Sequence, residues 1–350
     1  MLLRSRLGLI KAIQIGLAFL LVAPAYFVPV VAASSEVNVY SGRKEALIAP
    51  VLEAFTEKTG IRVNLLTGKA DQLRARLLSE GRNTPADVLL TSDVANLHRA
   101  STSGLFQAID SGLLKQRIPS RYRDPNGKWF GLSIRARVIA YAKDRVKPND
   151  LSTYENLADP RWRGRIVVRS STNVYNQSLI ASILAAHGNI AAGEWVAGLV
   201  ENMARRPQGG DTDQIRAVAS GEADVAIVNS YYYGRLLASV KDRDREVVAS
   251  VGIFFPNQGD RGTHVNLSGA GVTAHARHRF EAITLLEFLS SQKGQRLFAD
   301  INHEFPVNGE IAPSPIVAGW GSFKADALEL ATLGVYNGDA IRLADEFGWR

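Results

Sequence analysis

The stretch VNVYSGRKEALIAPVLEAFTEKTGIRVNLL, residues 37–66, decides the fold class. It opens with a short apolar run, turns at Ser41 and Gly42, and then repeats apolar residues at helical spacing. Gly60 stands where a helix commonly ends, and a second β-type run follows at 61–66. Strand, helix and strand at this spacing predict parallel strands covered by a helix.

The same alternation continues along the chain. The pattern predicts a helix at about 70–79 and a strand at 86–90, and it restarts with strands at 164–168 and 223–228 that flank further helices. Residues 131–143, rich in Ile, Val and Ala, predict a strand that crosses between the two units. We therefore expect an α/β protein of two lobes joined by crossing hinge strands, with a cleft between the lobes.

Composition excludes several classes of protein. The chain has 350 residues and no cysteine, so it has no disulfide framework and no thiolate metal site. Apolar residues make up 46% and charged residues 21%, values typical of a folded chain with a sizeable core. The net charge of +7 is spread along the chain, and no helix-turn-helix, zinc-finger or arginine-rich pattern occurs. We expect no nucleic-acid partner.

The first residues have the pattern of a secretion signal. Three basic residues precede position 12, and residues 12–35 carry no charge. Small residues end the stretch at Ala33, which predicts a signal peptide at 1–33 that is cleaved on export. A permanent membrane anchor is the alternative, because the apolar run is long enough to span a bilayer. Pro24 and Pro29 favour cleavage.

Motifs of common enzymes are absent from the sequence. There is no Walker A loop, no His-Glu-x-x-His and no Gly-x-Ser-x-Gly. Residues 269–274 (GAGVTA) satisfy the loose dinucleotide pattern Gly-x-Gly-x-x-Ala, but no clear βαβ unit follows them. We expect a protein that is not an enzyme; a secreted hydrolase is an alternative that no motif supports.

Tyrosines follow two of the predicted strands. Tyr231, Tyr232 and Tyr233 come shortly after the strand at 223–228, and Tyr175 stands at the matching place after the earlier strand. Ligands of open α/β folds bind at the carboxyl ends of strands. Half-buried phenol rings with solvated hydroxyls are the structural alternative for any single tyrosine. Three in a row cannot all lie in a core, however, so these phenols are candidate ligands.

Ionised phenols would need a strong positive charge nearby, since a free phenol has a pKa of about 10. A hard trivalent cation supplies that charge and prefers oxygen donors. Three phenolates would match the charge of Fe(III) and leave places for water or a small anion. Arg135 and Arg137, two apart on the predicted crossing strand, would balance such an anion, or they form a surface charge ladder. The polar helix start at 170–173 is a second candidate anion site.

Several segments resemble the periplasmic ferric-iron-binding proteins of ABC importers. The double tyrosine and the Ser-Ser-x-Asn-x-Tyr pattern are the specific ones, and the resemblance runs in order from about position 37 to at least position 306. It implies a two-lobed periplasmic-binding-protein fold of type II that binds Fe(III), with a synergistic anion such as carbonate, and delivers it to an inner-membrane ABC permease. The segments are 39–43 (VYSGR), 85–88 (PADV), 134–138 (IRARV), 170–178 (SSTNVYNQS), 221–224 (GEAD) and 229–232 (NSYY).

The resemblance also implies roles for individual residues. Tyr175, Tyr231 and Tyr232 match the ferric ligands, and Tyr233 lies one position past the usual pair. Many relatives place a histidine after the first turn, where this chain has Arg-Lys-Glu at 43–45. Further candidates for metal or nearby contacts are therefore Tyr40, Glu45 and Tyr233. The expected anion or neighbouring contacts are Arg135, Arg137, Ser171, Thr172, Asn173 and Asn229.

The lobes are expected to be discontinuous in sequence. We predict an amino-terminal lobe of residues 34–134 plus about 258–312, and a carboxyl-terminal lobe of about 135–257 plus 313–350. The protein is expected to be periplasmic and monomeric. The alternative function is the same fold binding an organic or phosphorylated anion through the two arginines and the helix start.

Overall fold

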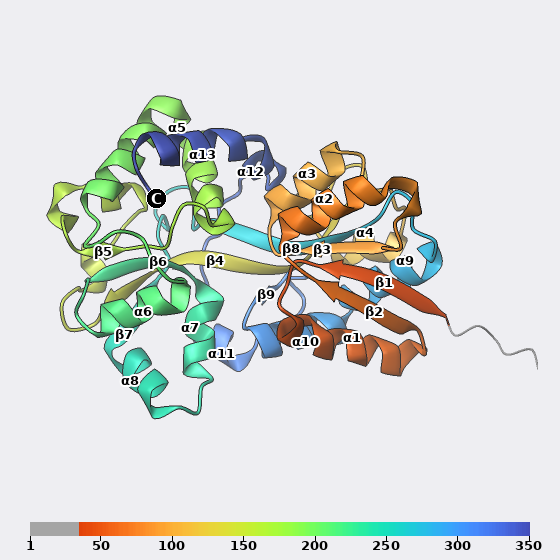
Figure 1. Ribbon diagram of the computed structural model, residues 1–350. Coiled ribbons are helices and arrows are strands. Elements are labelled where there is room, and N and C mark those ends of the chain that lie inside the picture. Colours follow the sequence, from red (N-terminus) through yellow and green to blue (C-terminus); the bar gives the residue numbers. More distant parts are fainter. Residues whose placement is uncertain (1–34) are drawn as a thin grey trace, which may run out of the picture. The chain divides into compact units, whose positions relative to one another are not determined.

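The computed structural model describes residues 35–350, so the predicted signal segment at 1–33 lies outside the described residues. A mixed sheet runs through the described chain in the order β2-β1-β3-β8-β4-β6-β5, and β7 and β9 both pair with β4 (Figure 1). Its strands are β1 (Glu36–Ser41), β2 (Arg62–Thr67), β3 (Val88–Thr91), β4 (Phe130–Ala142), β5 (Ile166–Val167), β6 (Val225–Asn229), β7 (Val251–Phe254), β8 (Val265–Val272) and β9 (Phe305–Pro306).

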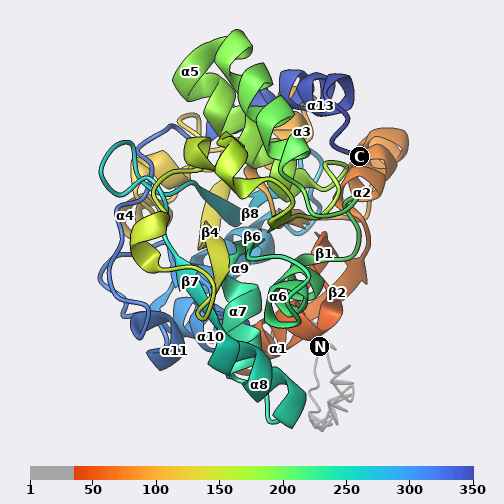
Figure 2. The ribbon, with the colours of Figure 1, turned by 90° about the vertical axis from the view of Figure 1, so that its left-hand side faces the viewer.

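Helices cover both faces of this sheet. The α-helices are α1 (Glu45–Thr59), α2 (Ala70–Glu80), α3 (Val94–Thr102), α4 (Gly112–Arg117), α5 (Val174–Glu201), α6 (Asp211–Ala219), α7 (Ser230–Leu237), α8 (Asp242–Ser250), α9 (Arg279–Leu289), α10 (Gln292–Asn302), α11 (Pro315–Ala318), α12 (Ala331–Val335) and α13 (Asn337–Glu346). Short 3₁₀ turns are η1 (Gly81–Asn83), η2 (Ser120–Tyr122), η3 (Pro148–Asp150), η4 (Glu155–Ala158) and η5 (Pro160–Trp162). In both ribbon views α5 and α13 lie on one side of β4 and β6, and α7 and α8 lie on the other (Figures 1 and 2).

The first α/β unit forms as its sequence predicts. β1 pairs in parallel with β2 on one side and with β3 on the other. α1 ends at Gly60, whose φ of 75° is in the left-handed region and whose N–H donates to the carbonyl of Thr56 at 2.8 Å. Glycine adopts this conformation without steric cost, which explains its use as the helix end.

β4 is the crossing strand that the sequence predicts at 131–143. Its first half pairs antiparallel with β8, and its second half pairs with β6 and β7. β8 also pairs with β3, so β4 and β8 together connect the two groups of strands. The α/β class and the crossing strands are confirmed, whereas the lobe bounds given above stay a prediction.

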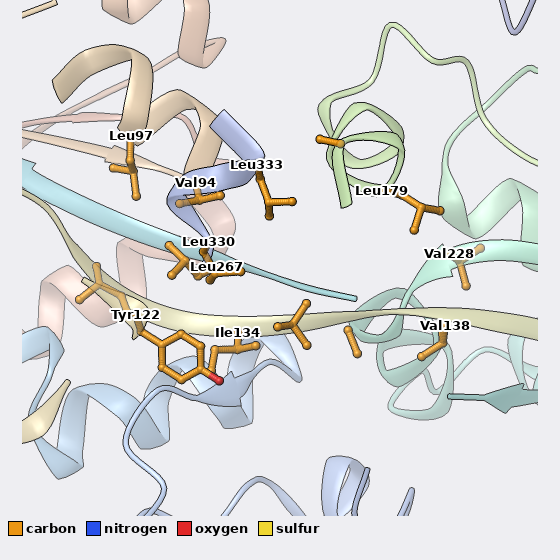
Figure 3. Packing of buried hydrophobic residues seen from close by; sticks show 14 of the residues in the cluster. Val94, Leu97, Tyr122, Ile134, Val138, Leu179, Val228, Leu267, Leu330 and Leu333 are labelled. Atoms are coloured by element: carbon orange, nitrogen blue, oxygen red, sulfur yellow. The ribbon is translucent and has the colours of Figure 1, made fainter. Parts of the chain in front are cut away.

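The apolar core lies along β4. Figure 3 shows Val94 and Leu97 of α3 near Leu267 of β8, on one side of β4. Farther along β4, Leu179 of α5 and Val228 of β6 pack in the same cluster. All five side chains are fully buried. One strand therefore contributes to the core of both groups of strands.

α5 is the longest helix of the described chain, and Gly188 interrupts it. At Gly188 φ is 78° and ψ is 176°, values outside the helical region. By length and composition α5 is apolar enough to cross a membrane, but Leu179, Ile183 and Val196 are buried in the core. A broken helix with such buried residues is typical of a core helix.

The glycines of the GAGVTA segment serve packing. They lie in β8, where a Cβ on Gly269 would stand 2.6 Å from the carbonyl oxygen of Phe130. A Cβ on Gly271 would stand 2.5 Å from the carbonyl oxygen of Lys128 and 2.6 Å from the Phe106 ring. The pattern therefore reflects close approach of backbone to backbone within the sheet.

Gly271→Ala should destabilise the protein by about 1–3 kcal/mol, because the added methyl group overlaps backbone that cannot easily move. Gly338→Ala is the control: no atom lies within 4 Å of the place in α13 that its added methyl group would take, so its free energy of unfolding should be unchanged or slightly higher. Denaturant unfolding of both variants measures the difference. Equal stability of the two would contradict this account of β8.

A buried ion pair ties the turn after β1 to the residue before β9. Arg43 donates to Glu304 through both terminal nitrogens, at 2.8 and 3.1 Å, and both side chains are about 3% exposed. Ser133 of β4 donates a further hydrogen bond to Glu304. Burial by itself raises the pKa of Glu304, but the Arg43 charge and these hydrogen bonds outweigh burial and hold the pKa below its ordinary value.

Glu304→Gln should lower the free energy of unfolding by about 3–5 kcal/mol at neutral pH, because Arg43 then keeps a buried charge without a partner. The pKa of Glu304 is lower in the folded state than in the unfolded state. Its contribution is therefore present above the ordinary value of 4.5 and is lost as the pH falls through the folded-state value.

Unfolding by denaturant at pH 7 and at pH 3 should show a large difference between Glu304→Gln and the parent protein at pH 7 and a smaller one at pH 3. Glu45→Gln, at an exposed carboxylate on α1, is the control and should change little. A difference that stays constant between the two pH values would be inconsistent with the lowered pKa of Glu304.

Candidate metal centre

Three of the predicted tyrosine ligands line one cleft. The cleft has a volume of about 400 Å³, and Tyr175, Tyr231 and Tyr232 form part of its wall. The opposite wall comes from the turn after β1, including Gly42 and Arg43. Residues more than 180 positions apart in the chain therefore meet at this cleft.

The strand ends set the positions of the three rings. Tyr175 is the second residue of α5, where the N-cap Asn173 accepts a hydrogen bond from its backbone N–H at 3.0 Å. Tyr231 and Tyr232 lie in the first turn of α7, directly after β6. The hydroxyl of Tyr231 donates to the hydroxyl of Tyr175 at 3.1 Å. The rings of Tyr231 and Tyr232 stack at 4.3 Å between centroids, so adjacent residues point to the same side.

Three further candidates for metal contacts lie elsewhere. The hydroxyl of Tyr233 donates to the carbonyl oxygen of Val251 at 2.9 Å, and that of Tyr40 donates to Glu80 at 2.9 Å. Glu45 is exposed at the start of α1 and lines a separate surface depression. None of the three lines the cleft, so the structure does not bring them to the other tyrosines.

The candidate anion contacts divide into two groups. Arg135 and Asn173 line the cleft itself. Arg137 and Asn229 line a much smaller adjoining space of about 10 Å³, where Arg137 donates to the buried carboxylate of Asp211 at 2.7 Å.

The other two polar residues of the helix start do not reach the cleft. Ser171 donates to the carbonyl oxygen of Trp349, and Thr172 lies on the exposed side of the loop within 2.9 Å of the Ser170 hydroxyl. The helix start therefore presents Asn173, and not Ser171 or Thr172, to the cleft.

Charged residues that the sequence interpretation missed surround the tyrosines. The guanidinium of Arg169 lies 5.4 Å from the ring centroid of Tyr175 and pairs with Asp211 at 3.2 Å. That of Arg235 lies 4.8 Å from the ring centroid of Tyr231. Such contacts place positive charge beside the phenol rings. The missed charged residues that line the cleft are Arg43, Lys44, Arg169, Asp211, Asp213, Arg235 and Glu304.

Two of these residues carried a detectable signal. Arg169 directly follows a predicted strand, as the tyrosines do, and Arg235 stands four residues after Tyr231, on the same face of α7. Glu304 carried none, because it reaches the cleft only through its pairing with Arg43 across 261 positions of sequence.

The hydroxyls of Tyr231 and Tyr232 are protonated at neutral pH in the protein alone. Burial raises the pKa of Tyr231 well above its ordinary value, and the neighbouring Tyr175 and Tyr232 raise it more than Arg135 lowers it. Burial, then Tyr175 and Asp211, raise the pKa of Tyr232 to about 12. Ionisation of these hydroxyls therefore requires an additional positive charge in the cleft.

Phenol oxygens are the donors that converge in the cleft, because its carboxylates are engaged elsewhere: Glu304 and Asp211 pair with arginines, and Asp213 accepts a hydrogen bond from the backbone N–H of Gly210. Among residues 35–350, no group of three or more His, Cys, Asp or Glu side chains is arranged to hold a metal ion. Oxygen donors suit hard cations, and a highly charged cation would supply the positive charge that ionises the phenols. The geometry therefore makes the cleft a candidate centre for a hard metal ion.

The sequence matches a known family and a protein of known name. The family model described as bacterial extracellular solute-binding protein matches residues 83–325. Iron uptake protein A1 of Synechocystis sp. is 49% identical over 315 residues, covering 90% of this chain and 88% of that protein.

Solved structures agree with this match. A Trichodesmium protein in complex with iron and citrate ligands has 47% sequence identity and a TM-score of 0.87, covering 90% of this chain and 100% of that one. The ferric binding protein from Campylobacter jejuni has 40% identity and a TM-score of 0.86, with coverage of 90% and 100%. These neighbours have the two-lobed fold expected from the sequence. The chain therefore belongs to the family of bacterial extracellular solute-binding proteins, and it is a binding protein rather than an enzyme.

Proposed function

We propose that this protein captures Fe(III) in the cleft through the phenolate oxygens of Tyr175, Tyr231 and Tyr232 and delivers it to an inner-membrane ABC permease for iron uptake. The observation that carries the proposal is the convergence of the three tyrosines in one cleft, with the hydroxyls of Tyr231 and Tyr175 only 3.1 Å apart. The names of the Synechocystis, Campylobacter and Trichodesmium relatives support iron as the cargo.

Charge balance supports a trivalent cation. Three phenolates carry three negative charges, and those of Tyr231 and Tyr232 form only in the presence of a strong cation because the pKa values of these two residues are raised. Of the nearby arginines, Arg43 is neutralised by Glu304, and Arg169 shares the single carboxylate of Asp211 with Arg137. The charge of Fe(III) would thus be matched by the tyrosines themselves.

The remaining positive charge in the cleft favours an anion on the metal. Among the described residues Arg235 forms no ion pair, and Lys44 forms none either, yet both line the cleft. An anion such as carbonate or citrate would occupy the coordination places that the tyrosines leave open. The amino-terminal half presents Arg43 where the family resemblance leads us to expect a histidine. We therefore propose that this half contributes no metal ligand.

The proposed cycle uses the crossing strands as a hinge. An open cleft admits Fe(III), the phenols of α5 and α7 bind it and release their protons, and closure screens the site from water. Reopening at the permease and reprotonation of the phenols would release the metal. We propose that export through the predicted signal segment at 1–33 brings the protein to the periplasm, where this exchange occurs.

Iron loading should give the protein a visible phenolate-to-metal charge-transfer band. Tyr231→Phe and Tyr232→Phe should each weaken that band and lower iron affinity by at least the roughly 10–100-fold that loss of an outer metal contact costs. Tyr233→Phe is the matched control, because it lies in the same run but its hydroxyl donates to Val251 and does not line the cleft. Absorption titration with ferric citrate measures both quantities.

A colourless iron-loaded protein, or unchanged colour in both cleft variants, would contradict the phenolate assignment. The competing cargo is an organic or phosphorylated anion without metal, since Arg135 and Arg169 line the same cleft. Calorimetric titration with such anions in the absence of iron separates the two. Tight binding that persists in Tyr231→Phe but is lost in Arg135→Ala would favour the anion.

Iron affinity should fall as the pH is lowered from about 8 to about 6. The phenols of Tyr231 and Tyr232 are protonated over this range, since burial raises the pKa of Tyr232 to about 12 and that of Tyr231 well above its ordinary value. Each of these phenols therefore releases one proton when it binds iron as a phenolate, and added protons compete with the metal. The number of protons released during iron loading, measured in weak buffer, should be smaller by about one in Tyr231→Phe than in the parent protein. Equal proton release would argue that Tyr231 stays protonated.

A further inference from the structure

The last residues of the chain contact the loop that leads to the metal centre. Trp349 is fully buried, and its indole N–H donates to the carbonyl oxygen of Arg169 at 3.0 Å. The backbone carbonyl of Trp349 accepts a hydrogen bond from the Ser171 hydroxyl. A single residue at the carboxyl end therefore holds the loop on both sides of Ser170.

This loop has direct consequences for the cleft. It connects β5 to α5, and the side chain of Arg169 lies between the ring of Tyr175, at 5.4 Å, and the carboxylate of Asp211, at 3.2 Å. Asn173, at the end of the loop, caps the backbone N–H of Tyr175. A shift of the loop would therefore move both a cation beside the phenol and the helix start that carries it.

The sheet holds this loop weakly. β5 has only two residues; it pairs with β6 on one side and, through Ile166 alone, with Met203 on the other. The side chains of Asn176 and Gln177 also donate to loop carbonyls, at 2.8 and 3.0 Å. Both lie in the first turn of α5, however, and would move together with Tyr175.

Trp349 itself is fixed to a different part of the molecule. Its ring packs edge-on against Trp195, in the second half of α5, with 6.2 Å between centroids. Its backbone N–H donates to the carbonyl oxygen of Ala344 in α13 at 2.9 Å. Phe347 packs so closely on α5 that a Cβ on Gly193 would stand 2.9 Å from its ring. Trp349 therefore connects the loop to α13 and to the second half of α5, beyond the break at Gly188.

We infer that Trp349 is a positioning residue for the metal centre. It holds the loop at 168–173, which carries Arg169, and thereby keeps the hydroxyl of Tyr175 next to that of Tyr231. The inference rests on the proposed iron-binding function for its effect on affinity. The two hydrogen bonds between Trp349 and the loop, called the clamp below, do not depend on which cargo the cleft binds.

Trp349→Phe tests the clamp because it keeps an aromatic ring and removes the indole donor. Trp129→Phe is the control: it also replaces a buried indole by a smaller ring, and it lies directly before β4, outside the loop and outside α5 and α13, which support Trp349. Hydrogen–deuterium exchange of the full-length, metal-free proteins should show faster exchange of amides in residues 169–176 for Trp349→Phe only. Ferric citrate titration should show about tenfold weaker binding and a shifted charge-transfer band for Trp349→Phe only.

Ser171→Ala and Ser171→Thr provide a second test if Trp349→Phe does not fold. Ser171→Ala loses the hydrogen bond to the carbonyl of Trp349 and should show the same faster exchange and weaker iron binding. Ser171→Thr keeps a hydroxyl and should show the exchange and the iron affinity of the parent protein. Exchange and iron binding equal to those of the Trp129→Phe control would overturn the inference. A parent protein that binds no iron would instead overturn the proposed function, and exchange in 169–176 would still decide whether the clamp exists.

Discussion

The backbone hydrogen bonds of β4 are the constraint on which the rest of the structure depends. This strand is 13 residues long, and it changes partners at its middle, from β8 to β6 and β7. Arg135 and Arg137 stand at that change, one beside Asp93 of the first unit and the other beside Asp211 of the second. Both groups of strands must keep their register on β4 for the two walls of the cleft to face each other.

The candidate metal centre combines buried phenols with paired charges. Arg43 is neutralised by Glu304, whereas Arg137 and Arg169 share the carboxylate of Asp211, so that this second group keeps one positive charge. Tyr231 and Tyr232 differ from these groups, because burial favours the neutral form of their phenols. Their rings are thus in place before a cation arrives, but their oxygens become charged only when one binds. Such an arrangement would favour cations of high charge over the monovalent and divalent cations of the surroundings.

Sequence patterns predicted the fold class and the central tyrosines for a physical reason. Strands and helices alternate along the chain, and local signals such as Gly60 mark their ends. The ends of parallel strands meet at one edge of the sheet, which brings Tyr175 and Tyr231 together. The partners of the arginines were not predictable, since side-chain pairing across distant segments leaves no local pattern. Arg137 was thus expected to serve an anion, but it is buried against Asp211. Tyr233 shares the run of its neighbours, but the helix turns its hydroxyl toward Val251.

The place of β8 in the sheet also affects how the chain can acquire its structure. β8 comes from residues 265–272, yet it lies between β3 and β4, which precede it by more than 120 positions. Pairings between segments so far apart slow folding, because the loop between them must be ordered before the contact forms. The sheet therefore cannot close until about three-quarters of the polypeptide has left the ribosome. Until then the edges of β3 and β4 that β8 joins lack this partner, so the two groups of strands cannot yet form the walls of the cleft.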